Sequence, residues 1–463
     1  MTNQIIFNKQ LIDRYDRSGP RYTSYPTVLQ FSEAYDDKDY LEWVATSNDD
    51  PIPASLSLYL HIPFCNTICY YCGCSKIVTK DTSQAEKYIK LLQQEIAIQG
   101  ALFDKTRPVV QIHWGGGTPT FLDDDTIGTI LGTIRKHFTV ADDDQGEFAI
   151  EVDPRTVNHD RITTLRSLGF NRISFGVQDF NPEVQQAVNR VHTKEQIFDC
   201  IKSARANNFH SINLDLMYGL PRQTISSFDQ TIQTTIEADP DRIAIYNYAH
   251  LPEMFKPQRR IDEKDLPSAE DKLKILQIAI EKLQAAGYVY IGMDHFAKET
   301  DDLVKAQQTG TLQRNFQGYS THANSDIIAM GITSISSIGD NYCQNVKTLE
   351  EYEDRINNNR IPVYRGLELE ADDLLRREVI NQLMCNFKLD ITRLESKWGI
   401  NFSSYFESVI DTLHTMAEDG LLKIDDTSIT VTLEGRLLVR SVCMLFDRYL
   451  QEPKTEQRFS KII

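Results

Sequence analysis

Four of the eight cysteines in this 463-residue chain lie within ten residues, in 65-CNTICYYCGC-74, directly after an apolar run. Their spacing is C-x3-C-x2-C-x-C. A structural zinc site usually draws on two separated C-x2-C pairs, so that four sulfurs surround one ion, and no second pair exists here. Three thiolates on one short loop can instead hold three corners of a cubane iron–sulfur cluster, which leaves the fourth iron open to a small ligand. A zinc loop and a redox-sensing thiol cluster are the alternatives.

A run of glycines follows the next apolar segment, in 113-HWGGGTPT-120. Glycines at the end of a strand let backbone N–H and C=O groups approach a ligand closely. The segment is not a phosphate-binding loop, which would continue as Gly-Lys-Ser/Thr, and it is not a G-x-G-x-x-G dinucleotide motif. Taken alone, it is equally well explained as a tight turn from a strand into a helix.

Several later apolar runs end in polar residues that a core would not select. Burying a carboxylate without a partner costs several kcal/mol, so such residues are either paired structurally or face a site. Each alone is ambiguous, but several at the same end of one sheet favour a site. These residues are Glu151, Gln178, Asp215 and the pair Ala249–His250, with Arg190 on the segment after Gln178.

The elements that would position these residues alternate in type. Strands are predicted at 56–62, 109–114, 147–152, 171–177, 211–217 and 242–248, and helices between them at 84–100, 196–208 and 225–238. Alternating strands and helices predict a parallel sheet with crossover helices. Six such units favour a (β/α)6 barrel or partial barrel, in which reactive groups sit where strands end and loops begin.

The two ends of the chain differ from this α/β region. Helical patterns at 371–386 and 404–419, then a hairpin and a helix within 420–446, predict a mainly helical, winged-helix-like C-terminal domain. We interpret it as a structural cap rather than a DNA-binding module. The expected organisation is an N-terminal segment covering the active site (1–50), a partial-barrel domain (51–300), a connecting and active-site segment (301–365) and the C-terminal domain (366–463).

Composition limits the partners. The net charge of −17 argues against broad binding to nucleic acid or anionic lipid. We expect no signal peptide and no membrane span. Eight cysteines in a chain of this length do not form a disulfide framework, and the four isolated ones are expected to be buried free thiols. The expected location is the cytoplasm.

The spacing C-x3-C-x2-C, with the aromatic Tyr71 before the third cysteine, resembles the radical S-adenosylmethionine enzymes, and the glycine loop resembles their second motif. Further motifs extend this resemblance along nearly the whole chain. With them the sequence is similar to the oxygen-independent coproporphyrinogen III oxidases (dehydrogenases), a family of haem biosynthesis. These motifs are 18-SGPRYTSYPT-27, YLHIPFC, EVDP, GVQDFN, DLMYGLP, 292-GMDHFA-297, 314-RNFQGY-319 and 449-YLQ-451.

The resemblance implies a reaction in which the ring A and B propionates of coproporphyrinogen III are oxidatively decarboxylated to vinyl groups, giving protoporphyrinogen IX. Cys65, Cys69 and Cys72 would ligate a 4Fe–4S cluster, and Cys74 is not an expected ligand. One electron would cleave S-adenosylmethionine at the cluster, and the resulting 5′-deoxyadenosyl radical would abstract a hydrogen from the β-carbon of a propionate.

The resemblance also implies two S-adenosylmethionine molecules bound side by side. Tyr59 and Glu151 are predicted to be catalytic as well as cofactor-binding. The residues expected around the first molecule are Tyr59, Tyr71, Gly116, Gly117, Thr118, Gln178, Arg190, Asp215 and Ala249, and those toward the second are Glu151, Phe316, Gln317 and Ile335.

A substrate with four carboxylates requires local cations on so acidic a chain, and we predict Arg21 and Arg314 as two of them. The alternative is that each arginine only bridges segments structurally. A monomer is expected, together with an electron donor of flavodoxin or ferredoxin type and an electron acceptor that the sequence does not identify. A haem chaperone of the same superfamily branch remains an alternative function, as does a winged-helix regulator with an iron–sulfur sensor.

Overall fold

A computed structural model describes residues 5–141, 144–322, 324–450, 459, 461 and 463 of the chain. The chain forms two compact units. The first, here called the sheet unit, contains Phe31–Ala279 and Asn324–Glu368, and the second, here called the helical unit, contains Met1–Gln30, Ile280–Ala323 and Leu369–Ile463. The segment boundaries expected from the sequence stay a prediction. Gln451 of the YLQ motif lies outside the described residues.

All six predicted strands form in the sheet unit. They are parallel, and each pairs with the next one in chain order. This is the (β/α)6 arrangement that the sequence predicts, and the described strands do not close it into a barrel. The strands are β1 (Leu56–Ile62), β4 (Pro108–Gly116), β6 (Glu147–Val152), β7 (Arg172–Gln178), β8 (Ser211–Tyr218) and β9 (Arg242–Asn247).

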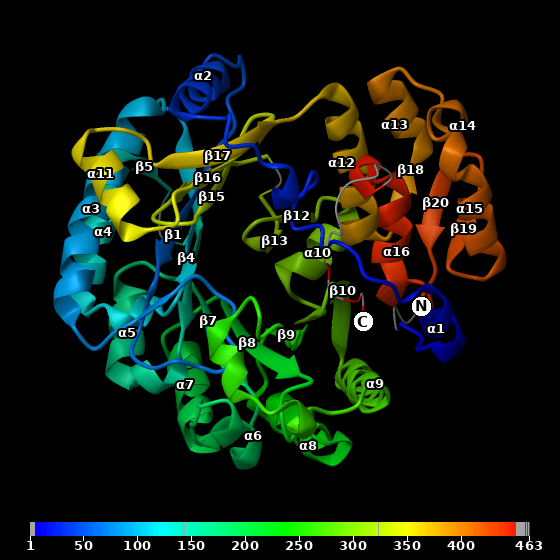
Figure 1. Ribbon diagram of the computed structural model, residues 1–463, viewed down its shortest axis with the longest axis horizontal. Helices are drawn as coiled ribbons and strands as arrows, with labels where there is room; N and C mark the ends of the chain where they lie inside the picture. The colour runs from blue at the N-terminus through cyan, green and yellow to red at the C-terminus, as the bar shows by residue number, and fades with distance from the viewer. Residues whose placement is uncertain (1–4, 142–143, 323, 451–458, 460, 462) are drawn as a thin grey trace. The chain divides into compact units, whose positions relative to one another are not determined.

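Helices connect these strands and lie along the outside of the sheet (Figure 1). Their starts are fixed by side-chain caps: Asp123 accepts from the backbone of Thr126, and Thr193 and Gln196 form a capping box. The helices are α3 (Thr82–Leu102), α4 (Asp124–His137), α5 (His159–Ser167), α6 (Pro182–Ala187), α7 (Lys194–Ala206) and α8 (Ile225–Ala238). The three predicted helices therefore form, within a few residues of their predicted bounds.

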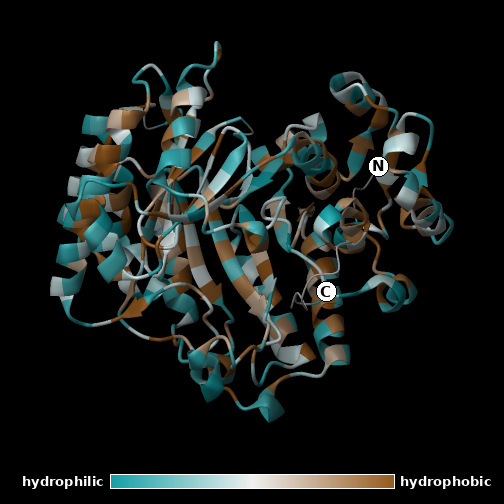
Figure 2. Cartoon of the chain, turned by 45° about the horizontal axis from the view of Figure 1, so that its top comes forward, coloured by the Kyte–Doolittle hydropathy of each residue, from teal (hydrophilic) through white to brown (hydrophobic). Residues whose placement is uncertain are grey.

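Burial alternates along the central strands, so the two faces of the sheet differ. In β6, β7 and β8 the apolar residues Ile150, Phe175 and Leu214 are buried, whereas Glu151 and Asp215 on the opposite face are half-buried. Figure 2 shows this alternation of apolar and polar residues along the strands. Because successive side chains of a strand point to opposite faces, the half-buried polar residues share one face, here called the inner face.

Four further strands extend the sheet beyond β1, where the sequence predicted only a connecting segment. They are β14 (Asp326–Met330), parallel to β1, and the antiparallel β15 (Ile335–Ile338), β16 (Asn341–Asn345) and β17 (Val363–Glu368). Helix α11 (Leu349–Asn357) connects β16 to β17, and α2 (Asp37–Asn48) precedes β1. Buried Glu95 of α3 anchors the extension by accepting hydrogen bonds from Gly331 N, Asn345 Nδ2 and Tyr352 Oη.

The helical unit contains the predicted C-terminal elements. Helix α12 (Ala371–Asn386) has the bounds expected from the sequence, and the predicted hairpin of β19 (Leu422–Ile424) and β20 (Ser428–Val431) gains a third strand, β18 (Lys388–Asp390). The other helices are α1 (Lys9–Tyr15), α10 (Asp302–Thr309), α13 (Ile391–Trp398), α14 (Phe402–Tyr405), α15 (Glu407–Glu418) and α16 (Val439–Cys443).

Two short hairpins complete the helical unit: β10 (Tyr288–Gly292) with β11 (His295–Lys298), and β12 (Gln313–Asn315) with β13 (Gly318–Ser320). Helix α9 (Ala269–Ala285) contributes residues to both units. Among the described residues, no helix combines the length and the apolar character that crossing a membrane requires.

Candidate functional site

The cysteine loop, residues 65–78, begins and ends on two short paired strands. Strand β2 (Phe64–Cys65) runs parallel to β3 (Ile77–Val78), and the backbone N–H of Thr79 donates to the carbonyl of Cys65 at 3.0 Å. The loop therefore leaves the end of β1 and returns to the same place. All eight cysteines of the chain are free; Cys69 is buried, Cys65 and Cys72 are half-buried, and Cys74 is exposed.

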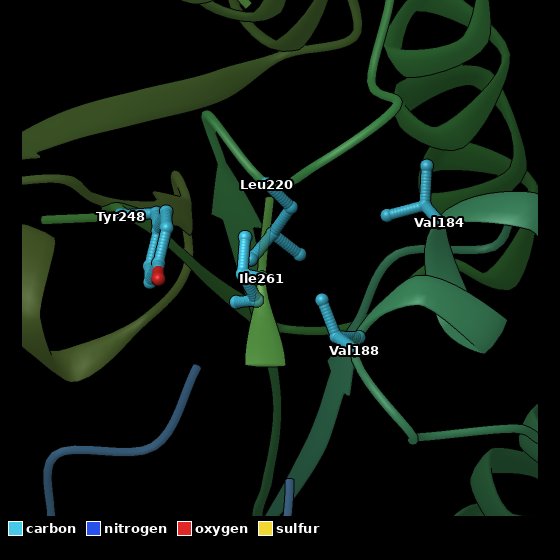
Figure 3. Packing of buried hydrophobic residues seen from close by; sticks show 5 residues of the cluster. All are labelled: Val184, Val188, Leu220, Tyr248 and Ile261. Atoms are coloured by element: carbon cyan, nitrogen blue, oxygen red, sulfur yellow. The ribbon is translucent and has the colours of Figure 1, made fainter. Parts of the chain in front are cut away.

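The back of the loop is fixed to neighbouring segments by hydrogen bonds to its backbone. Tyr70 N donates to Val188 O at 3.0 Å, Asn189 Nδ2 donates to Ile68 O at 2.7 Å, and Gln258 Nε2 donates to Tyr71 O at 3.0 Å. The rings of Tyr70 and Tyr71 pack against an apolar cluster that Figure 3 shows. Its buried members are Val184, Val188, Leu220, Tyr248 and Ile261. This packing explains why two aromatic residues precede the third cysteine.

Two guanidinium groups approach the sulfur of Cys69. Arg190 Nη1 lies 3.5 Å from Cys69 Sγ and 3.1 Å from Asp153 Oδ2, while its Nε donates to the carbonyl of Gly176 at 2.9 Å. Arg155 Nη2 donates to Asp153 Oδ2 at 2.6 Å and lies 3.8 Å from the same sulfur. Burial opposes ionisation of Asp153, but the two arginines hold the pKa of its carboxyl below the usual range. The two guanidinium groups therefore place positive charge beside the Cys69 sulfur. We call this loop, with Asp153, Arg155 and Arg190, the cysteine corner.

Cys72 and Cys74 differ in protonation. A hydrogen bond from Cys74 lowers the pKa of the Cys72 thiol, and the same contact raises the pKa of Cys74. Lys76 Nζ donates to the carbonyl of Cys72 at 3.0 Å and adds positive charge. Cys72 is thus set to be a thiolate, which is the metal-binding form of cysteine, and Cys74 to remain a thiol.

The glycine loop contacts the chain that leads into Cys65. Gly117 N donates to Ile62 O and Thr118 N donates to Phe64 O, both at 2.8 Å, and Thr118 Oγ1 lies 3.5 Å from Cys65 Sγ. A side chain would not fit here, because a Cβ on Gly117 would lie 2.6 Å from the backbone of Pro63. Gly116 has a φ of +111°, which favours glycine. The two sequence motifs therefore form one structural unit.

Polar side chains line the inner face of the sheet. Tyr59 stacks on His113 with ring centroids 5.8 Å apart, and His113 Nε2 lies 3.1 Å from Glu151 Oε1. Asp215 accepts from Ser174 Oγ at 2.9 Å and from Asn213 Nδ2 at 2.8 Å. Burial and the nearby charge of Glu151 raise the pKa of Asp215 to about 6.

The donor set suits an iron–sulfur cluster better than one metal ion. No group of three or more His, Cys, Asp or Glu side chains in the described part of the chain converges on a single-ion site. A cubane does not require such convergence, because each of three irons takes one thiolate. Gln178 has a φ of +71°, and its Oε1 is buried with no hydrogen-bond partner among the described residues. A buried acceptor without a donor suits a polar ligand on the inner face.

The remaining predicted residues fall in both units. Ala249 follows β9 and Ile335 begins β15, and both are half-buried in the sheet unit. Phe316 and Gln317 form the turn between β12 and β13 in the helical unit. Arg21, also in the helical unit, donates to Asp294 Oδ2 at 2.6 Å, so that carboxylate already balances its charge.

Arg314 lies in a different environment, which we call the arginine pocket. Its guanidinium carbon is 4.8 Å from the centre of the Tyr319 ring, its cross-strand neighbour. Arg314 Nε and Nη1, and also Tyr319 Oη, are buried with no hydrogen-bond partner in the described structure. His295 lies edge-on to Tyr319 at 5.3 Å, and burial together with Arg314 lowers the pKa of this histidine to about 4, which keeps it neutral.

Sequence reasoning missed four residues of these sites: Asp153, Arg155, His295 and Tyr319. Asp153 stands inside the motif EVDP and Arg155 directly after it, while His295 and Tyr319 belong to GMDHFA and RNFQGY. These four residues lie in or directly beside the segments that the motifs mark. Only the folded contacts show which side chain in each segment meets a sulfur or leaves a buried donor unpaired.

Comparisons with known proteins match this architecture. The model of the radical SAM superfamily matches residues 59–235, and that of the HemN C-terminal domain matches residues 369–438. Oxygen-independent coproporphyrinogen III oxidase of Pseudomonas aeruginosa is 49% identical over 463 residues, covering 100% of both chains. The Escherichia coli enzyme of the same name is 47% identical over 99% of both. A solved structure of E. coli coproporphyrinogen III oxidase, described as a radical SAM enzyme, matches with a TM-score of 0.91 and 46% identity, over 96% of this chain and 100% of that one.

Proposed function

The chain belongs to the family of oxygen-independent coproporphyrinogen III oxidases, and on that premise we propose that it oxidatively decarboxylates the ring A and B propionates of coproporphyrinogen III to vinyl groups. The product would be protoporphyrinogen IX, an intermediate of haem biosynthesis. Full-length identity of 42% to 49% to several curated members supports the assignment.

Cys65, Cys69 and Cys72 would hold a 4Fe–4S cluster, and two S-adenosylmethionine molecules would bind beside it. When bound, these groups supply the one-electron chemistry that begins the reaction by hydrogen abstraction. The protein's own contribution is binding and orientation. Arg190 and Arg155 place positive charge beside Cys69, at 3.5 and 3.8 Å from its sulfur.

The inner face offers groups suited to S-adenosylmethionine. Asp215 accepts hydrogen bonds and suits ribose hydroxyls, while the unpaired Oε1 of Gln178 suits a donor of the ligand. The glycines of the glycine loop carry no side chain of their own, which lets their backbone groups approach a ligand closely. Tyr59 and Glu151, joined through His113, would orient the reacting groups. The observation that carries the proposal is the contact between the cysteine loop and the glycine loop at the end of β1.

We assign Arg314 to one carboxylate of the substrate. Two of its buried N–H groups have no partner in the part of the chain that the structure describes, and leaving such donors unpaired costs about 1–3 kcal/mol each. A carboxylate would accept both, as a charge-assisted pair. Tyr319 Oη could donate to the same anion. Arg21 is the weaker candidate, because it already pairs with Asp294.

The cellular setting that we propose is a reducing compartment, the cytoplasm. All eight cysteines are free, including the exposed Cys74, and free exposed thiols persist where disulfides are not favoured. An electron donor of flavodoxin or ferredoxin type would reduce the cluster. The monomeric state stays a prediction.

Product analysis tests the proposed function. Protein reconstituted with iron and sulfide under anaerobic conditions would be supplied with coproporphyrinogen III, S-adenosylmethionine and dithionite. We expect each substrate molecule to lose two carbon dioxide molecules in sequence, with formation of 5′-deoxyadenosine. Mass spectrometry of the products measures both. Tight haem binding without turnover would overturn the proposal in favour of a haem chaperone.

A further inference from the structure

The outer side of the cysteine loop is covered by one surface segment, residues 251–260. The ring of Phe255 packs on Gly73, where an added Cβ would lie 3.2 Å from it. Arg260 stacks on Tyr70 at 5.2 Å, and Gln258 Nε2 donates to the carbonyl of Tyr71 at 3.0 Å. This segment is therefore the protein surface next to the loop that would carry the cluster.

Apolar side chains on this surface are unusually exposed. Met254 is 67% exposed and Leu251 40%, both within 251–260, and Val191 at the end of the segment 188–191 is 55% exposed. Both segments form hydrogen bonds with the cysteine loop. Clustered exposed apolar residues mark an interaction site more often than isolated ones do.

Within 251–260 three cations outnumber one carboxylate, although the chain as a whole carries a net charge of −17. Lys256, Arg259 and Arg260 are exposed, and none of them forms an ion pair among the described residues. Glu253 is the single carboxylate within 251–260. Just beyond the segment, Asp262 accepts from Lys264 N at 3.0 Å, and Glu263 lies 3.8 Å from His250.

We propose that this patch, formed by Val191, Leu251, Met254, Lys256, Arg259 and Arg260, is the docking site of a small acidic one-electron carrier protein. The proposal rests on the proposed function, which requires a reduced cluster. Long-range repulsion between two acidic proteins leaves a basic patch as the favoured point of encounter. Redox encounters use small interfaces, so a patch of a few residues is sufficient. In each encounter the reduced carrier would give one electron to the iron–sulfur group, and the carrier would leave oxidised by one electron.

The test uses reconstituted protein and a flavodoxin as the carrier. The variant K256E/R259E/R260E should bind oxidised flavodoxin at least about tenfold more weakly at low salt, measured by fluorescence anisotropy. Its cluster should be reduced correspondingly more slowly by flavodoxin hydroquinone in stopped-flow absorbance. Reduction by dithionite, which needs no docking, should be unchanged. The matched control is K90E/K202E, which reverses two exposed lysines on α3 and α7 that form no ion pair in the described structure.

Because Arg260 touches Tyr70, the pair K256E/R259E repeats the test should the triple variant fail to fold. Binding and reduction equal to those of K90E/K202E would overturn the proposal. A second result would also overturn it. If sedimentation showed that the wild-type protein self-associates and the patch variants do not, the patch would bind a second copy of this chain and not a carrier protein. If the wild-type protein formed no product with dithionite as reductant, the proposed function would be contradicted. The measurement of flavodoxin binding would still test the docking site on its own.

Discussion

The cysteine corner and the arginine pocket each bury an arginine, in opposite electrostatic settings. Arg190 in the cysteine corner donates to a backbone carbonyl, to the carboxylate of Asp153 and to a sulfur. Arg314 in the arginine pocket has two buried donors with no partner among the described residues, beside the hydroxyl of Tyr319, which likewise has none there. The first set of contacts is complete within the protein, so it stabilises the fold and prepares the loop. The second set leaves buried donors that an anion would satisfy, and this difference is the reason for our assignment of Arg314 to the substrate.

The largest expected effect comes from removing a ligand in the cysteine corner. Cys69→Ser should abolish the iron–sulfur cluster and all turnover, because serine has no sulfur with which to ligate an iron of the cluster. Iron and sulfide analysis after anaerobic reconstitution measures this. Cys74→Ser is the control, since its hydroxyl can still donate to Cys72, and it should retain the cluster. Equal loss of iron in both variants would make Cys74 a ligand.

Replacing each arginine by methionine tests the contrast directly. Arg190→Met removes one partner of a buried pair and should lower the free energy of unfolding by about 3 kcal/mol, although Asp153 keeps Arg155. Arg314→Met removes unpaired buried donors and should leave stability unchanged or slightly increased. Denaturant unfolding of the two proteins without cluster compares them. A large loss in Arg314→Met would show that this arginine has protein partners.

Arg314→Met should also weaken substrate use. Loss of one charge-assisted carboxylate contact is expected to cost about 2 kcal/mol, or roughly thirtyfold in the KM for coproporphyrinogen III. Cleavage of S-adenosylmethionine without substrate should continue at the normal rate. Arg314→Lys, which keeps the charge but not the two-pronged geometry, should recover part of the loss. An unchanged KM in both variants would remove Arg314 from the substrate site.

The smallest effect concerns pH and Asp215. Its folded pKa is raised to about 6 by burial and by Glu151, above the value of an unfolded aspartate. The folded protein thus holds this proton more tightly, so the contribution of Asp215 to the free energy of unfolding falls as pH rises from about 4 to about 6. Asp215→Asn has no such titration. Allowing for the partial exposure of Asp215, the free energy of unfolding of this variant relative to wild type should rise by about 1–2 kcal/mol from about pH 4 to about pH 6. A difference that stays constant with pH would contradict this assignment.

The sequence predicted regular elements better than contacts. The six strands and the bounds of α12 follow from hydrophobic periodicity, which reports local burial. The extension of β14 to β17 was missed, although 326-DIIAM-330 is a short apolar run, because such a run does not reveal that its partner is β1, about 270 residues earlier. The pairing of Arg21 with Asp294 was beyond prediction for the same reason. Motifs locate segments, whereas long-range contacts decide which side chains are already paired.

The central claim is that three thiolates of the cysteine loop hold a cluster whose remaining iron is open to S-adenosylmethionine. Electron paramagnetic resonance of the dithionite-reduced, reconstituted protein tests it most directly. We expect the signal of one reduced 4Fe–4S cluster per chain, with a clear change of its g values when S-adenosylmethionine is added, in wild type and in Cys74→Ser alike. A colourless protein carrying stoichiometric zinc, or a cluster signal that S-adenosylmethionine leaves unchanged, would contradict it.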